Sequence, residues 1–236
     1  MSGPTFLDFA RMANACYYAN DPLVPVYTRV FYGQLESGFK ASRYTANVGA
    51  AGGDTVVCFA GTDSDETEVT DSGDKLADLG FAGAAVAGIV SQISPLLGLA
   101  VSAGQRRLME QVNGALEFTR QAQYFGGPQG RVYVCGHSLG GGLAQIICAQ
   151  LGLQGVAFNA PAVSQMGYSI APPERFFCVN QARDPVSGGT SFIGGHLGTV
   201  INIDNGSGMA AAHFLGPIVS YLESGSGAAL GARHPF

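Results

Sequence analysis

The sequence has few charged residues, and positive charge is especially scarce. Charged residues make up 12% of the 236 residues, and the lysines number two, Lys40 and Lys75. With a formal net charge of −5, the chain offers no basic patch to neutralise a phosphate backbone. Nucleic acid is therefore not expected as a partner. Hydrophobic residues make up 47%, which argues against disorder for most of the chain.

The N-terminal segment, residues 1–22, lacks the basic stretch and the long apolar core of a secretory signal peptide. We therefore expect a protein that is cytoplasmic as synthesised, with secretion by a signal-independent route as the alternative. Pro4 and Thr5 instead predict the start of a helix whose apolar face extends to Tyr17.

Cysteine is present in an odd number and in apolar surroundings, which indicates free, buried thiols rather than a disulfide framework. No cluster has the spacing of zinc ligands, so we expect no metal site. The cysteines are Cys16, Cys58, Cys135, Cys148 and Cys178.

Strand and helix patterns alternate along the chain, which predicts an α/β fold with a mostly parallel central sheet and helices on both faces. Residues 39–47 and 55–60 are expected to pair as a hairpin, and an amphipathic helix is expected over residues 106–123. The remaining strands are predicted at residues 26–32, 132–135, 155–159, 176–180 and 199–204, with a terminal helix at 211–222. We expect a single domain over residues 1–224 and a flexible C-terminal tail over residues 225–236.

The most informative motif is Gly136-His137-Ser138-Leu139-Gly140, which follows a β-branched run and precedes an apolar helix pattern. A strand, a sharp turn and a helix in this order lift the serine hydroxyl above the sheet. Glycines flank the serine because the strained turn leaves no room for larger side chains. Ser138 is therefore the predicted nucleophile.

A serine nucleophile requires a base and a group that orients the base. Asp184 follows the 176–180 strand, and Pro185 favours an extended backbone there, so Asp184 is the predicted acid and Asp204 its rival. Of the four histidines, His213 follows the last strand and is the predicted base. The other three are not the expected base: we expect His137 to brace the turn and His196 to be structural, and His234 lies in the tail.

Ester hydrolysis also requires hydrogen-bond donors for the oxyanion. One is the amide that follows the nucleophile, at Leu139. The other is expected from the loop after an early strand, at the amide of Thr62.

Residues 79–105 carry no charge and form a lid-like segment. Glycines and Pro95 interrupt the run, and a membrane span here would separate Thr62 from Ser138. We expect either a packed helical hairpin or a mobile apolar cover over the active site.

These segments resemble the class 3 lipase family of the filamentous-fungal and bacterial type. GDTVVCFAGT is similar to its oxyanion loop, VYVCGHSLGGGLA to its nucleophile region, VNQARDPVS to its acid segment and AAHFLGPIVSYL to its histidine segment. The resemblance implies an α/β-hydrolase fold, carboxylic-ester hydrolysis and no cofactor, with Ser138, Asp184 and His213 as the triad.

The expected function is that of a serine ester hydrolase, a lipase or phospholipase, acting on apolar acyl esters with transient contact at a membrane interface. One alternative is an antibacterial lipase toxin delivered by a signal-peptide-independent secretion system, which would have an inhibitor or immunity protein as partner. Another is a catalytically silent hydrolase-fold module that binds a partner. The sequence predicts no oligomeric state.

Overall fold

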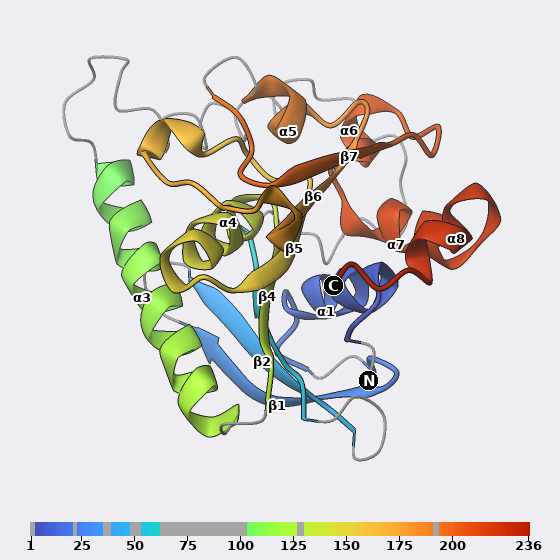
Figure 1. Ribbon diagram of the computed structural model, residues 1–236. Coiled ribbons are helices and arrows are strands. Elements are labelled where there is room, and N and C mark those ends of the chain that lie inside the picture. Colours follow the sequence, from blue (N-terminus) through green and yellow to red (C-terminus); the bar gives the residue numbers. More distant parts are fainter. Residues whose placement is uncertain are drawn as a thin grey trace.

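A computed structural model describes residues 3–20, 23–34, 39–47, 53–61, 103–126, 130–190 and 194–236 (Figure 1). Its strands are β1 (Tyr27–Gln34), β2 (Lys40–Ala46), β3 (Thr55–Phe59), β4 (Val132–His137), β5 (Gln154–Phe158), β6 (Phe176–Gln181) and β7 (Thr199–Ile203). Its α-helices are α1 (Phe6–Ala15), α3 (Ala103–Gly126), α4 (Leu139–Leu151), α5 (Pro185–Gly189), α6 (Met209–Ala212), α7 (Leu215–Glu223) and α8 (Ala228–Gly231). Short 3₁₀ turns are η4 (Ser164–Met166), η5 (Pro173–Arg175) and η6 (Gly225–Gly227).

The strands form one seven-stranded sheet in the order β1-β2-β3-β4-β5-β6-β7. The first three strands pair antiparallel, and β3 to β7 pair parallel. The predicted hairpin is confirmed, since Ala41 faces Phe59 and Thr45 faces Thr55. The carboxyl ends of the parallel strands lie along one edge, where loops can bring their side chains together.

Helices cover both faces of this sheet (Figure 1), which confirms the predicted α/β architecture. One face packs against α3 and α4 through side chains such as Val57, Val134 and Ile147. The other packs against α1 and α7 through side chains such as Phe9, Cys135 and Ile218. Alternate residues of a strand point to opposite faces, so a fully apolar strand serves both cores.

All five cysteines are buried and unbridged, as the sequence predicts. Burial raises the pKa of thiols such as Cys16 and Cys178 because the thiolate loses its hydration. These cysteines act as small apolar core residues.

Two expectations about chain ends are corrected. The expected flexible tail instead forms η6 and α8, and Phe236 stacks on Tyr133 with ring centroids 5.7 Å apart. Leu230 and Phe236 pack against the α1 and α7 core, and burial of this apolar surface holds the segment in place. The expected terminal helix is split into α6 and α7 by a break at His213 and Phe214.

Most of the lid-like segment lies outside the described residues, as does Thr62. Within the part of the chain that the structure describes, no helix combines the length and the apolar character needed to cross a membrane.

Candidate active site

The turn after β4 holds Ser138 in a backbone conformation that few residues other than glycine adopt. Its φ is 56° and its ψ is −131°, and the residue is 5% exposed. A Cβ on Gly136 would collide with the Gly140 backbone, and one on Gly140 would collide with the backbone of Phe59 and Ala60. The two glycines of the motif are therefore required by close backbone packing. The predicted strand, turn and helix are confirmed.

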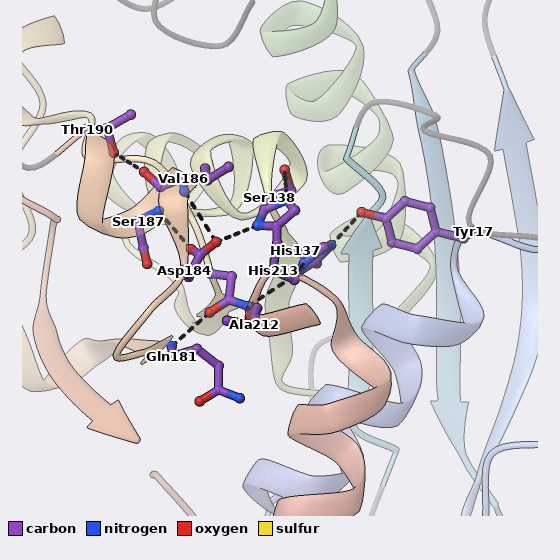
Figure 2. A network of polar contacts seen from close by, with 11 residues as sticks. Tyr17, His137, Ser138, Gln181, Asp184, Val186, Ser187, Thr190, Ala212 and His213 are labelled. Carbon is purple, nitrogen blue, oxygen red and sulfur yellow. Dashed lines mark hydrogen bonds and ion pairs between the residues drawn. The ribbon is translucent and has the colours of Figure 1, made fainter. Parts of the chain in front are cut away.

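His213 lies between Ser138 and Asp184 and contacts both (Figure 2). Its Nε2 lies 3.0 Å from Ser138 Oγ, and its Nδ1 lies 2.7 Å from Asp184 Oδ1. Nδ1 therefore donates to the carboxylate, which leaves Nε2 free to accept the serine proton. The three residues are far apart in the sequence, and the sheet edge brings them into one line of hydrogen bonds.

Asp184 is positioned by the start of α5. It is the N-cap of that helix, with Pro185 as the first helical residue, and its carboxylate accepts from the amides of Val186 at 3.2 Å and Ser187 at 2.7 Å. Burial opposes ionisation, but hydrogen bonds from His213 and Ser187 and the His213 charge outweigh it and lower the pKa of Asp184. Asp184 thus stays anionic and can stabilise a protonated His213.

The backbone of His213 is held by side chains from two neighbouring strands. Its carbonyl oxygen lies 2.7 Å from His137 Nε2 and accepts a hydrogen bond from Asn159 Nδ2 at 3.0 Å. Asn159 also donates to the Ala212 carbonyl at 2.7 Å. The break between α6 and α7 is therefore anchored to the ends of β4 and β5.

The rival candidates lie elsewhere. Asp204 is exposed, and its carboxylate accepts from the Gly206 amide in a local turn. His196 Nε2 lies 3.1 Å from the Asn180 amide, and His234 Nδ1 lies 2.6 Å from the Gly3 carbonyl. Neither histidine shares a hydrogen bond with Ser138 or Asp184 among the described contacts.

The candidate oxyanion donors are described only in part. Leu139 is the first residue of α4, where amides have no partner within the helix. Thr62 lies outside the described residues, and its role stays a prediction. Gly61 precedes it and lies against Ser138, since a Cβ there would meet Ser138 Cβ at 2.8 Å. The loop after β3 thus reaches Ser138.

Sequence reasoning missed the roles of Asn159 and Tyr17. Asn159 directly follows β5 and has a φ of 45°, which is uncommon for a residue other than glycine. It follows the strand next to the one that leads to Ser138, and this position in the sequence could have indicated a role at the site. The Tyr17 hydroxyl lies 2.6 Å from His137 Nδ1, and no local pattern marks that contact.

Metal ligation has no candidate in the residues that the structure describes, because no group of three or more His, Cys, Asp or Glu side chains could hold an ion.

Comparison with known proteins gives only distant likenesses. No family model matches the sequence, and no curated protein matches it. Membership of the class 3 lipase family therefore stays a prediction.

Several solved structures of hydrolases are similar in architecture. A Rhizomucor miehei lipase–propeptide complex is 15% identical, with a TM-score of 0.49, over 84% of this chain and 66% of that one. XC6422 from Xanthomonas campestris, an α/β serine hydrolase without a lid, is 14% identical over 86% and 94%, with a TM-score of 0.42. Carboxyl esterase 2 from Tuber melanosporum is 11% identical over 96% and 94%, with a TM-score of 0.41. This chain thus spans just under two thirds of the Rhizomucor chain.

Proposed function

We propose that this protein is a serine ester hydrolase that cleaves carboxylic esters of apolar acyl chains, as a lipase or phospholipase does. The observation that carries the proposal is the position of His213, hydrogen-bonded at once to Ser138 Oγ and to Asp184. A serine at a strained turn, with a base and an oriented carboxylate in reach, has the arrangement that nucleophilic acyl transfer requires.

The reaction has two halves. In the first, Ser138 Oγ attacks the ester carbonyl while His213 Nε2 takes the hydroxyl proton, and His213 then gives this proton to the leaving alcohol. In the second, water attacks the acyl-enzyme, again with His213 as base, and Ser138 is released. Asp184 fixes the His213 tautomer in both halves, and the amides of Leu139 and Thr62 are the proposed donors to the oxyanion.

The preference for apolar acyl groups is supported by the sequence. Residues 79–105 contain no charged side chain and follow the proposed oxyanion loop. Such a stretch suits an acyl-binding wall or a surface that adsorbs to a lipid interface. A panel of p-nitrophenyl esters of increasing acyl length tests this part separately from the chemistry.

The decisive test replaces the nucleophile. Ser138→Ala should reduce turnover of a p-nitrophenyl ester by at least about 10³-fold while the thermal midpoint stays near that of the wild type. Ser220→Ala, at an exposed serine on α7, is the matched control and should retain full activity.

A fluorophosphonate probe separates this proposal from a catalytically silent module, because only an activated serine is labelled. We expect one label per wild-type chain and none on Ser138→Ala. An unlabelled, inactive wild type would contradict the proposal.

A further inference from the structure

The hydroxyl of Tyr17 joins two parts of the candidate site that belong to different loops. It lies 2.6 Å from His137 Nδ1, and it accepts a hydrogen bond from the Gly61 amide at 2.9 Å. Tyr17 follows α1 and is buried, with its ring edge-on to His137 (Figure 2). One phenol thus contacts both the residue before the nucleophile and the loop after β3.

The donor and the acceptor of each hydrogen bond between Gly61, Tyr17, His137 and the His213 carbonyl follow from the chemistry of the groups. The His213 carbonyl can only accept, so His137 Nε2 must carry a hydrogen to bind it at 2.7 Å. Burial lowers the pKa of His137 to about 3, helped by the nearby His213 charge, so the ring is neutral and its Nδ1 is an acceptor. Tyr17 must therefore donate to Nδ1, and its oxygen is left to accept from Gly61.

The surroundings leave little room for any other arrangement. The His137 and His213 rings have centroids 4.9 Å apart. A Cβ on Gly61 would meet the Tyr17 hydroxyl at 2.7 Å and the His137 carbonyl at 3.0 Å. The loop backbone, the phenol and the buried imidazole are therefore in direct contact, and a change in one is transmitted to the others.

We propose that Tyr17 is a positioning residue that holds the His137 ring so that its Nε2–H binds the His213 carbonyl, while the same hydroxyl holds the backbone of Gly61 after β3. The inference rests on the proposed ester hydrolysis, in which His213 and the oxyanion loop act together. Tyr17 does not touch the reacting atoms. It acts through a relay from Gly61 through Tyr17 and His137 to the His213 carbonyl.

Removal of this one hydroxyl breaks the relay without changing the shape of the core. In Tyr17→Phe, His137 Nδ1 loses its donor, and the ring is held only by the bond from its Nε2–H to the His213 carbonyl. The imidazole can then tilt, that bond weakens, and the backbone of the base loses part of its anchor. The Gly61 amide would lose its acceptor as well.

The first measurement is steady-state kinetics on a p-nitrophenyl ester. Tyr17→Phe should lower kcat by roughly tenfold to a hundredfold with little change in KM, because a misplaced base affects the chemical step. Tyr133→Phe is the matched control. Tyr133 is a fully buried tyrosine of β4 whose hydroxyl has no hydrogen-bond partner among the described residues. This control should keep wild-type kcat.

The second measurement reads the relay itself, by ¹H–¹⁵N NMR of the His137 ring. The Nε2–H resonance should be the same in the wild type and in Tyr133→Phe, and it should move upfield in Tyr17→Phe because its bond to the His213 carbonyl weakens. A merely structural role for Tyr17 would lower the thermal midpoint without changing this resonance.

Two results would overturn the inference: kcat of Tyr17→Phe within twofold of the wild type, or an unchanged His137 Nε2–H resonance in that variant. The second can be measured even without activity. An inactive, probe-resistant wild type would refute the proposed hydrolase, whereas an unchanged Nε2–H resonance would refute the relay alone.

Discussion

The two faces of the sheet contribute to the site in different ways. The α3 and α4 face is built by helices that connect consecutive strands, and its core holds Ile147, Val134 and Leu143. The α1 and α7 face is built by segments from both ends of the described chain, and its core holds Phe9, Ile218 and Phe177. The first face carries α4, which begins beside Ser138. The second carries α7, which follows His213, and α1, which leads to Tyr17.

This difference separates local from long-range positioning. Ser138 is fixed by a turn whose close contacts come from Gly136, Gly140 and the end of β3. His213 is fixed by contacts with Asp184, Asn159 and His137, each more than twenty residues away in sequence. The base should therefore be the more sensitive of the two to changes in core packing.

The largest expected effect is on the free energy of unfolding, and it can be tested at two fully buried isoleucines, Ile147 of α4 and Ile218 of α7. Ile147→Ala and Ile218→Ala should each lower the free energy of unfolding by about 2–5 kcal/mol, because each leaves a cavity. Under folding conditions Ile218→Ala should also lower kcat several-fold, since α7 follows His213 directly. Ile147→Ala should not.

The measurement combines denaturant unfolding with kcat per active site, counted by fluorophosphonate titration. Counting active sites removes the contribution of unfolded chains from the comparison. Equal kcat losses in the two variants would contradict the view that the two faces differ.

Much of the fold was readable from the sequence because its signals are local. The strand predicted before Gly136, the helix beginning at Leu139 and the proline after Asp184 each predict local geometry, and the structure confirms all three. The choice of Asp184 and His213 over their rivals followed from chain order at the sheet edge.

The features that sequence reasoning missed depend on tertiary packing. Phe236 was assigned to a flexible tail because the segment before it is rich in Gly, Ala and Ser, yet its ring packs against Phe9, Tyr133 and Phe177. The apolar periodicity of α1 marked Tyr17 as a core residue, but periodicity cannot show what a hydroxyl meets. His137 was expected to brace the turn. It also binds the backbone of the base, through a contact 76 residues away.

The next effect concerns His137 and the pH dependence of stability. Its pKa is about 3 in the folded protein because of burial, against an ordinary value of 6.5. Between these values the unfolded chain binds the extra proton, so stability falls as the pH falls from 6.5 towards 3, by about 1.4 kcal/mol per pH unit for this one group. Above pH 6.5 this contribution is constant.

The test is urea unfolding of the wild type and His137→Gln from pH 4 to pH 8. In His137→Gln the free energy of unfolding should fall less steeply with falling pH, because the contribution of His137 is absent. His196 has a pKa lowered by burial, so a smaller slope should persist over this pH range, whereas the lowered pKa of Asp184 costs stability only below its ordinary 3.8. Parallel curves for the two proteins would show that His137 is not held neutral.

The smallest expected effect concerns the far end of α1, where Thr5 and Asp8 form a capping box. Thr5 Oγ1 accepts from the Asp8 amide at 3.1 Å, and Asp8 Oδ2 accepts from the Thr5 amide at 2.9 Å. Thr5→Ala should lower the free energy of unfolding by about 1 kcal/mol, because helix amides lose an acceptor. It should leave kcat unchanged, since the cap lies at the opposite end of α1 from Tyr17.

Urea unfolding and ester kinetics on the same preparation test the expected loss of stability and the unchanged kcat. A kcat loss as large as that of Tyr17→Phe would mean that α1 as a whole, rather than the Tyr17 hydroxyl, sets the position of the base.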